Sequence, residues 1–424
     1  MQRRKFLSAA ALLAFKPDFS KAGSLFTPSV FESNDEDNEA YWKELRGMFT
    51  LEKEKVFLNN GTMGIMSIPV QQAVEQAFRD TANKAQYPGH KDDLQKIIGE
   101  LIGADYTEIG ITKNVSEGNN IACWGIPLKK GDEVIMTRHE HVGGCAPWLH
   151  RAKLDGIKVK TAELGKTAAE TLDNIKKAVT KKTKVIAVPH IPCTIGQVLP
   201  VKEICEFART KNIISCIDGA HPLGMIRFNV KDIGCDYYYG CVHKWALGPI
   251  GVGYIYVRKE MIPKTRTIHV AAYAVNDFNM SANPPMLGDL VNTGNRFSYG
   301  SFCGPIHEGA TKALQIYKSI GPEKIEKRSK SLAKYLQDHL LDFGNKIEML
   351  TPTEDISRAC QIGFRINNGK EKPNSEFVNK CAKKNIILRY VGENGIDNIR
   401  VSTHYYNSFE ELDILINEVK STLG

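Results

Sequence analysis

Residues 213–257 read IISCIDGAHPLGMIRFNVKDIGCDYYYGCVHKWALGPIGVGYIYV, and this stretch decides the fold class. A short apolar run, 213–217, ends in Asp218 and a glycine. A buried strand that delivers a carboxylate at its carboxyl end, just before a turn, is typical of the ligand crevice of an open α/β sheet. A second strand-like run, 236–240, precedes Lys244 and the glycine-spaced segment GPIGVG. The stretch therefore predicts an α/β fold in which Asp218 faces a ligand.

Lys244 and Asp218 together indicate a cofactor. A lysine among aromatic and apolar residues is a candidate nucleophile, because its ammonium form is poorly solvated there. Pyridoxal 5′-phosphate needs such an amine to hold its aldehyde as a Schiff base, and a carboxylate to keep its ring nitrogen protonated. Either residue alone is more often a solvated surface group. The pairing is what predicts a pyridoxal phosphate site with Lys244 and Asp218 as catalytic residues.

Three motifs inside the stretch resemble a known family: DGAH at 218–221, GCDYYYG at 234–240 and HKW at 243–245. They are similar to the core of the class-V aminotransferase family of pyridoxal phosphate enzymes, and most similar to its isopenicillin N epimerase-like branch, which is related to the cysteine desulfurases. The resemblance extends from about residue 57 to the C-terminus. It implies fold type I, an α/β architecture. In this fold, helices cover both faces of a mainly parallel seven-stranded sheet in a large domain, and a smaller α+β C-terminal domain follows.

A chain of 424 residues is long enough for several such parts. We expect a twin-arginine-type signal at residues 1–25, an N-terminal arm and helix at 26–56, the large cofactor-binding domain at 57–305 and the small domain at 306–424. The formal net charge is +8, and the basic residues form no stripe. We therefore expect no nucleic-acid partner.

The first residues, MQRRKFLSAAALLAF, hold a twin-arginine pair, Arg3 and Arg4, before a short apolar run. The run is too short to span a bilayer, so it predicts export of a folded protein to the periplasm and no integral membrane segment. The ten cysteines show no C-x-x-C pair and no metal-ligand spacing, and several lie in apolar runs as reduced core cysteines do. So many free thiols favour the alternative, a cytoplasmic location.

A strand-like run at 108–112 leads through KNVSEGNN into a helix, an arrangement that offers free backbone N–H groups to a phosphate. The resemblance places Val115 and Ser116 at two phosphate-binding positions and implies a further phosphate contact from His243. The Gly-Ser pair that ends at Ser301 resembles a Gly-Thr pair that in relatives crosses a dimer interface and contacts the phosphate of the other subunit. Ser301 thus implies a homodimer with shared active sites.

An E-H pair at 140–141 and a P-W pair at 147–148 match a pattern of many class-V enzymes. In that pattern the histidine stacks on the cofactor ring, where an imidazole is also able to take part in proton transfer. His141 is therefore a candidate for cofactor binding and for catalysis. His139 and His150 are expected to be surface histidines.

Two residues compete for the contact with the phenolic oxygen of the cofactor. Cys193 stands where the desulfurases have Asn and the epimerase-like branch has Ser, and its S–H group is only a weak donor. His221, three residues after Asp218, matches the position of a Gln or His that is able to make the same contact. We prefer His221 and keep Cys193 as the second candidate.

Arg400 lies on a short apolar run followed by His404 and two tyrosines, at the position where class-V enzymes hold the substrate carboxylate. A planar cation with two donors suits that task better than a lysine does. Arg389 lies upstream in LRYVGENGIDNIRVS, and Asn60 lies in the turn VFLNNGTMGIMS, which resembles the mouth of the family's active site. These residues are the candidates for binding a small-molecule substrate, an amino acid or an amino-acid-containing peptide.

Such a site commits the chain to chemistry at the α-carbon of an amino acid, and the fate of the α-carbanion decides the reaction. Epimerisation or transamination is expected, and epimerisation needs a second acid, for which His141, Tyr390 or a cysteine is available. A β-lyase or C–S lyase reaction and desulfuration are the alternatives. Desulfuration is the least favoured reaction, because residues 388–402 contain no cysteine and Cys381 precedes them on a helix-like segment. An exported binding protein without activity would lack cofactor contacts, and none of the main contacts is missing.

Overall fold

The computed structural model describes residues 38–52, 54–86, 91–367, 369 and 373–424. The predicted signal at residues 1–25 lies outside these ranges, as does the first part of the N-terminal arm. The first described element is helix α1 (Glu39–Arg46), and the side chain of Asn38 caps it by accepting a hydrogen bond from the Ala40 amide at 2.9 Å. Among the described helices, none is long and apolar enough to cross a membrane.

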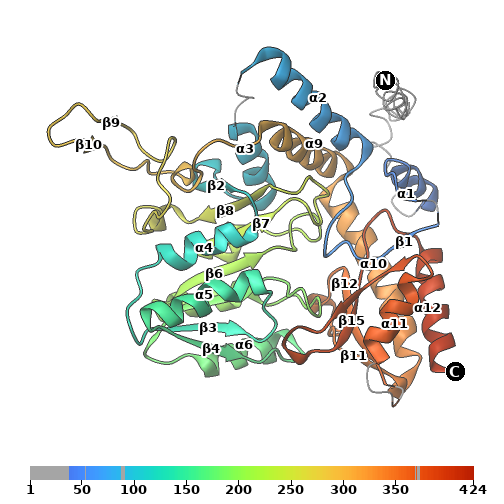
Figure 1. The fold of residues 1–424 in the computed structure, drawn as a ribbon. Coiled ribbons are helices and arrows are strands. Elements are labelled where there is room, and N and C mark those ends of the chain that lie inside the picture. The colour runs from blue at the N-terminus through green and yellow to red at the C-terminus, as the bar shows by residue number, and fades with distance from the viewer. Residues whose placement is uncertain (1–37, 53, 87–90, 368, 370–372) are drawn as a thin grey trace, which may run out of the picture.

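Seven strands form the central sheet, in the order β2-β8-β7-β6-β5-β3-β4 (Figure 1). They are β2 (Ile109–Thr112), β3 (Glu133–Thr137), β4 (Lys158–Ala162), β5 (Thr183–Pro189), β6 (Ile214–Gly219), β7 (Tyr237–Cys241) and β8 (Gly253–Val257). β8 is antiparallel to both of its neighbours, and every other neighbouring pair is parallel. The mainly parallel seven-stranded sheet that the resemblance implies is confirmed.

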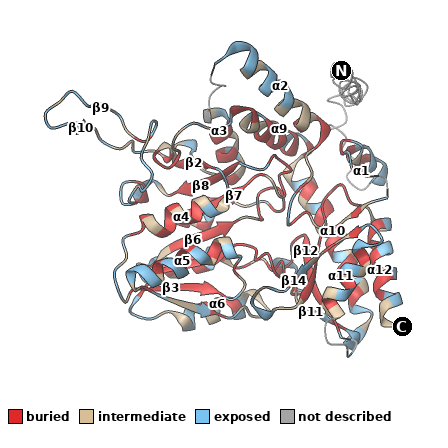
Figure 2. Cartoon of the chain, viewed as in Figure 1, coloured by how far each residue is buried: buried red, intermediate tan, exposed pale blue. Residues whose placement is uncertain are grey.

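Helices cover both faces of this sheet, and each face has its own apolar core. Ile186 and Val188 of β5 belong to one core, whereas Val185 and Ala187 belong to the other, because successive side chains of a strand point to opposite faces. The first core includes α3 (Lys91–Ile102), α6 (Ala168–Ala178), α7 (Val201–Thr210) and α9 (Gly304–Ile320), and the second includes α4 (Val115–Gly125) and α5 (Val142–Asp155). The inner strands are therefore buried almost throughout (Figure 2).

A smaller lobe follows, built on an antiparallel sheet of order β11-β12-β15-β14 (Figure 1). Its elements are α10 (Pro322–Leu341), β11 (Ile347–Met349), β12 (Gln361–Ile366), α11 (Pro373–Ala382), β14 (Arg389–Val391), β15 (Asn398–Ser402) and α12 (Phe409–Leu423). The N-terminal segment joins this lobe, since β1 (Val56–Phe57) pairs with β13 (Ile386–Ile387). Ala310 and Leu314 of α9 still belong to the core of the central sheet. The core of the central sheet thus reaches into α9, whereas α10 contributes to the core of the small lobe; the expected domain bounds stay a prediction.

Three consecutive carbonyl groups of the large lobe accept hydrogen bonds from the small lobe. The bonds run from Arg400 to Cys193 at 2.9 Å, from Asn398 to Thr194 at 3.0 Å and from Thr351 to Ile195. Gly196 follows with a φ of +72°, and a Cβ there would stand 2.4 Å from the Gln361 carbonyl oxygen. Residues 193–196 thus form a tight seam between the lobes, and this seam runs past the pocket described below.

A hairpin of β9 (Phe278–Asn279) and β10 (Met286–Leu287) extends away from the body of the molecule (Figure 1). Its large apolar side chains are exposed: Phe278 at 66%, Met280 at 72% and Leu287 at 60% (Figure 2). Exposed apolar groups gathered in this way are typical of a surface that contacts another chain.

Candidate active site

A pocket of about 450 Å³ opens at the carboxyl ends of the parallel strands. Its walls come from the loops that follow β2, β3, β5, β6 and β7, and from Gly61, Thr62 and Arg389. Ligands of open α/β sheets bind at this edge, and the size suits a small-molecule site. The strand order therefore brings together residues that are more than a hundred positions apart in the sequence.

Asp218 lies at the end of β6 and lines the pocket, although it is only 8% exposed. Its Oδ1 accepts the Ala220 amide at 2.9 Å, and its carbonyl oxygen accepts the His190 amide at 2.8 Å, so that backbone contacts fix the strand end. Burial raises the pKa of Asp218, and the hydrogen bond from Ala220 partly offsets that effect. This carboxylate is placed to meet a positively charged group of a ligand.

Lys244 lies in the loop between β7 and β8 and lines the same pocket. Its Nζ is 3.3 Å from Nε2 of His221. Burial lowers the pKa of His221 well below the usual value, so this imidazole is neutral at ordinary pH. The structure thus places the preferred partner of the phenolic oxygen directly beside the lysine.

His141 caps helix α5, and its Nδ1 accepts the Gly143 amide at 3.0 Å. Its ring lines the pocket, and burial lowers its pKa. A Cβ on Gly143 would stand 2.5 Å from Oγ of Ser116. This glycine therefore lets α5 approach the loop that carries Ser116.

Glu140 was noted in the sequence only as part of the E-H pair and was given no role, but it also lines the pocket. It is 5% exposed, and its Oε1 accepts the amide and the hydroxyl of Thr137 at 3.1 Å and 2.9 Å. A Cβ on Gly144 would stand 3.2 Å from Oε2 of Glu140 and 3.4 Å from Oδ2 of Asp218, so the two carboxyl groups flank this glycine. Burial raises the pKa of Glu140 to about 8. Its place directly before His141, at the end of a strand, is the signal that sequence reasoning missed.

The expected phosphate residues Val115, Ser116 and His243 all line the pocket. Val115 and Ser116 begin helix α4, where Asn114 accepts the Glu117 amide at 2.9 Å. The first N–H groups of a helix have no partner within it, and they attract anions. His243 also lines the pocket, and its Nδ1 is buried without a hydrogen-bond partner in the described part of the chain. An unsatisfied ring nitrogen beside a helix N-terminus is consistent with an anionic ligand group.

Arg400 is fully buried, and it lies just behind the pocket wall. Its NH2 group donates to Asn59 Oδ1 at 2.9 Å and to the hydroxyl of Thr62 at 2.8 Å, and Thr62 and Cys193 line the pocket in front of it. Burial lowers the pKa of Arg400 to about 9. No carboxylate pairs with this guanidinium among the described residues, and its Nε has no partner either. Arg389 lines the pocket and pairs with Glu393.

Asn60 takes a different place from the one expected of a substrate-binding residue. It is fully buried and does not line the pocket. Its Nδ2 donates to the carbonyl oxygen of Lys244 at 3.4 Å, and its Oδ1 accepts the hydroxyl of Tyr406 at 2.9 Å. The structure therefore makes Asn60 a support of the loop that carries the lysine.

The structure also shows where two further histidines, Cys193 and Ser301 lie. His139 was expected on the surface, and this expectation is wrong: the residue lines the pocket, and its Nδ1 lies 2.8 Å from the hydroxyl of Thr194. The reason is that the loop after β3 turns toward the seam. His150 is exposed, as expected. Cys193 also lines the pocket, and burial raises the pKa of its thiol. Ser301 is exposed and lies outside the pocket of its own chain.

Comparison with known proteins agrees with this arrangement. A family model described as aminotransferase class-V matches residues 82–415. The chain belongs to the class-V aminotransferase family. Isopenicillin N epimerase of Streptomyces clavuligerus is 24% identical to it over 409 residues, which cover 91% of this chain and 98% of the relative. A probable cysteine desulfurase of Pyrococcus abyssi (strain GE5 / Orsay) is 24% identical over 397 residues, which cover 88% of this chain and 96% of the relative.

A solved structure gives the same fold. The apo structure of cysteine desulfurase from Thermococcus onnurineus NA1 superimposes with a TM-score of 0.79 at 23% identity, covering 90% of this chain and 97% of that chain. Fold type I is thereby confirmed for this class-V aminotransferase family member.

Family membership also confirms the predicted cofactor, pyridoxal 5′-phosphate. The residues present are compatible with it: a buried carboxylate at Asp218, an amine at Lys244 and an unpaired Nδ1 at His243 face one pocket. Gly143 and Gly144 leave open the space that side chains would fill between Ser116 and Asp218.

Proposed function

We propose that this class-V enzyme acts at the α-carbon of an amino acid, or of a peptide that contains one, as an epimerase or an aminotransferase. The observation that carries the proposal is the pairing of Lys244 and Asp218 in one pocket, with Arg400 directly behind its wall. A buried guanidinium without an acidic partner is costly, and a substrate carboxylate would offset that cost. The site thus has one place for the cofactor and one for an amino-acid carboxylate.

When bound, pyridoxal phosphate supplies an electron sink for the charge that develops at the α-carbon. Asp218 would hold its ring nitrogen, and the amine of Lys244 would move the α-proton. Val115, Ser116 and His243 would hold its phosphate. In this arrangement Arg400 orients the substrate carboxylate, while Arg389 and its partner Glu393 make up a polar part of the wall.

The hydrogen bonds of the two nearest histidines leave Lys244 as the base. Nδ1 of His141 accepts the Gly143 amide, and Nδ1 of His221 accepts the indole N–H of Trp245. A neutral imidazole whose Nδ1 accepts carries its proton on Nε2, so neither ring has a free lone pair to offer. A single amine is sufficient for transamination. Epimerisation would use the thiol of Cys193 as the second acid, because burial keeps that thiol protonated and in the wall.

Desulfuration or C–S lysis is the second candidate function, and the desulfurase relative supports it. A desulfurase needs a reactive cysteine thiolate above the site. Cys381 is fully buried in the core of the small lobe, and burial raises its pKa to about 12. This residue is therefore poorly placed for that role.

A panel of amino acids incubated with the enzyme in deuterated solvent tests the proposal. Exchange of the α-proton with loss of chirality would support epimerisation, and a keto acid without ammonia would support transamination. Pyruvate with ammonia, or released sulfide, as the sole products would instead establish the lyase or desulfurase alternative. Lys244→Ala should abolish both turnover and the yellow colour that borohydride removes from the enzyme.

We further propose a homodimer with shared active sites. Ser301 is exposed and lies outside its own pocket, and the β9–β10 hairpin offers an apolar surface to a second copy.

We also propose twin-arginine export, with the cytoplasm as the alternative. Eight of the ten free cysteines are buried, and only Cys303 is exposed. Because buried thiols are shielded from oxidants, the free cysteines are compatible with an oxidising compartment. Fractionation of cells that produce the full chain distinguishes the two locations.

A further inference from the structure

Trp245, the residue after Lys244, holds the histidine that lies beside the lysine amine. Its indole nitrogen Nε1 lies 3.0 Å from Nδ1 of His221, and both side chains are buried. Nε2 of the same imidazole lies 3.3 Å from Nζ of Lys244. The histidine therefore stands between an indole and the lysine amine.

An indole N–H group donates and never accepts, so Nδ1 of His221 must be the acceptor in this contact. A protonated Nδ1 would point its own hydrogen at the hydrogen of the indole. The imidazole consequently carries its single proton on Nε2, and the imidazolium form is excluded while the contact with Trp245 holds. Nε2–H then faces Lys244 as a donor.

Other contacts hold Trp245 in this position. Nε2 of His404 donates to the carbonyl oxygen of Trp245 at 2.8 Å, and the two rings stack with centroids 5.6 Å apart and an interplanar angle of 19°. Nδ1 of His404 accepts the amide of Tyr405 at 2.9 Å, which assigns its proton to Nε2 as well. Leu247, two residues further on, has a φ of +57°, a conformation rare for leucine, so the surroundings dictate the course of this loop.

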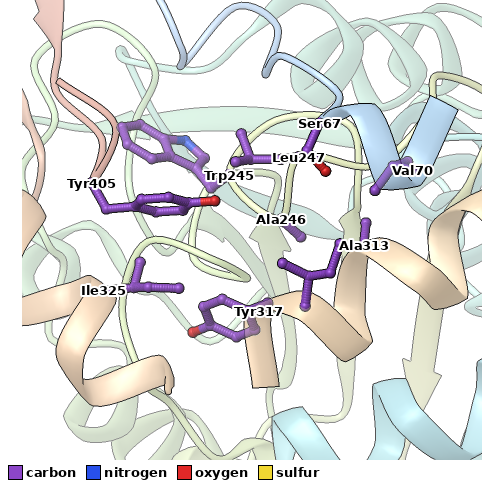
Figure 3. A pocket seen from close by; sticks show the side chains of 10 residues that line it. Ser67, Val70, Trp245, Ala246, Leu247, Ala313, Tyr317, Ile325 and Tyr405 are labelled. Carbon is purple, nitrogen blue, oxygen red and sulfur yellow. The ribbon is translucent and has the colours of Figure 1, made fainter. Parts of the chain in front are cut away.

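The space behind the loop is nearly filled. A cavity of about 10 Å³ remains there, lined by Trp245, Leu247, Tyr317 and Tyr405 (Figure 3). It is too small for more than one water molecule. The indole has little room to turn away from His221.

We propose that Trp245 is a positioning residue that fixes His221 as the Nε2–H tautomer, so that His221 acts only as a hydrogen-bond donor toward the lysine side of the pocket. The proposal rests on the proposed function for the identity of the acceptor, the phenolic oxygen of the cofactor. It adds that His221 passes no proton during turnover. No bond is made or broken at His221, and the α-proton is moved by Lys244, with Cys193 as the second acid in the case of epimerisation.

The tautomer can be measured directly. The full chain, labelled with ¹⁵N-histidine, is studied by NMR with and without pyridoxal phosphate, and the His221 signals are identified by their loss in His221→Gln. In the unaltered protein Nδ1 should have the shift of an unprotonated nitrogen and Nε2 that of an N–H. Trp245→Phe keeps a ring for the stack with His404 and removes the donor. It should give a mixture of both tautomers, with the dissociation constant for pyridoxal phosphate raised roughly three- to tenfold by the weakened contact.

Trp148→Phe is the matched control. Trp148 is another fully buried indole whose N–H donates to a side chain, Asn119 Oδ1 at 3.0 Å. This variant should leave the tautomer of His221 unchanged. A proton on Nδ1 of His221 in the unaltered protein would overturn the proposal, even if Trp245→Phe failed to fold, and so would an unchanged tautomer in a folded Trp245→Phe. These readouts do not depend on turnover, so an enzyme with a different reaction would still show the Nε2–H tautomer.

Discussion

Gly64 lies directly against Lys244: a Cβ on this glycine would stand 1.9 Å from the carbonyl oxygen of the lysine. The Gly64 amide also donates to the carbonyl oxygen of His243 at 2.8 Å. Asn60 and His404 donate to the next two carbonyl groups, those of Lys244 and Trp245. The backbone around the lysine is thus held at three successive residues by segments from both ends of the chain.

Gly64→Ala should therefore displace the lysine loop, because the added methyl group meets backbone and not the flexible end of a side chain. We expect a loss of stability of about 1–3 kcal/mol, as for other overpacked sites, and a loss of visible absorbance after reconstitution with pyridoxal phosphate. Thermal unfolding and absorbance spectra measure the two effects. Met63→Ala in the same turn is the control, since Met63 is 45% exposed and should tolerate the change. Normal cofactor binding by Gly64→Ala would contradict the importance of this contact.

Arg400→Lys should raise the KM for the amino-acid substrate by about 10- to 100-fold, with a smaller effect on kcat. A lysine cannot reproduce the planar pair of donors, and hydrogen bonds to charged groups are worth about 1.5–3 kcal/mol. Steady-state kinetics measure the change. Arg358→Lys is the control, because Arg358 is also buried but donates to Gln337 within the small lobe. It should lower stability and leave KM near that of the unaltered enzyme; equal KM values for all three proteins would argue against a carboxylate site at Arg400.

Glu140→Gln should flatten the pH dependence of stability in the cofactor-free protein. The folded-state pKa of Glu140 is raised to about 8 from an ordinary value of 4.5, so the folded state holds its proton more tightly than the unfolded state does. The stability that Glu140 contributes is complete below pH 4.5 and is lost as the pH rises toward 8, by at most about 1.4 kcal/mol per pH unit. Urea unfolding at several pH values measures the free energy of unfolding. Relative to the unaltered protein, this free energy should increase for the variant as the pH rises between these limits.

The control for this change is Glu108→Gln, which removes another buried carboxylate, one that is paired with Lys231. This variant should be less stable because the ion pair is broken, and the decrease of its stability with rising pH that Glu140 causes should remain. If the free energy of unfolding changed with pH in the same way for Glu140→Gln and the unaltered protein, the inference that the Glu140 carboxyl is protonated would be wrong.

Replacing Phe278 and Leu287 together by glutamate should convert a dimer into a monomer. The two residues are partners across the β9–β10 hairpin, and charges there would oppose burial against a second copy. Analytical ultracentrifugation measures the mass, and cofactor retention should fall as well if Ser301 serves the neighbouring site. Ile356→Glu alters an equally exposed apolar residue, at 70% exposure, away from the hairpin and should change neither property. A monomeric unaltered protein would end the proposal of shared sites.

The sequence predicts the strand-end chemistry well, because local patterns and a general topological rule are sufficient for it. The strand-like runs expected at 213–217 and 236–240 correspond to β6 and β7, and Asp218 and Lys244 lie at the same edge, since the carboxyl ends of parallel strands meet there. His141 was predicted from the resemblance to the E-H and P-W pattern of class-V enzymes, and it lines the same pocket. These residues need no knowledge of how the two lobes dock.

Residues whose place depends on contacts between segments far apart in the sequence are harder to predict. Asn60 was expected at the pocket wall, but its long-range bonds to Tyr406 and Lys244 turn it toward the lysine loop. His139 was expected on the surface, and its bond to Thr194 brings it into the pocket. No periodicity in the chain encodes these pairings, because each joins segments that are far apart in the sequence and meet only in the folded chain.

The seam at residues 193–196 also keeps the two lobes docked. Swinging the small lobe outward as a rigid lid would strip three carbonyl groups of their donors, at about 1 kcal/mol each, and separate Gly196 from Gln361. The docked arrangement of the two lobes is therefore favoured by about 3 kcal/mol from these three hydrogen bonds alone, and the loop that carries Cys193 keeps its place in the pocket wall.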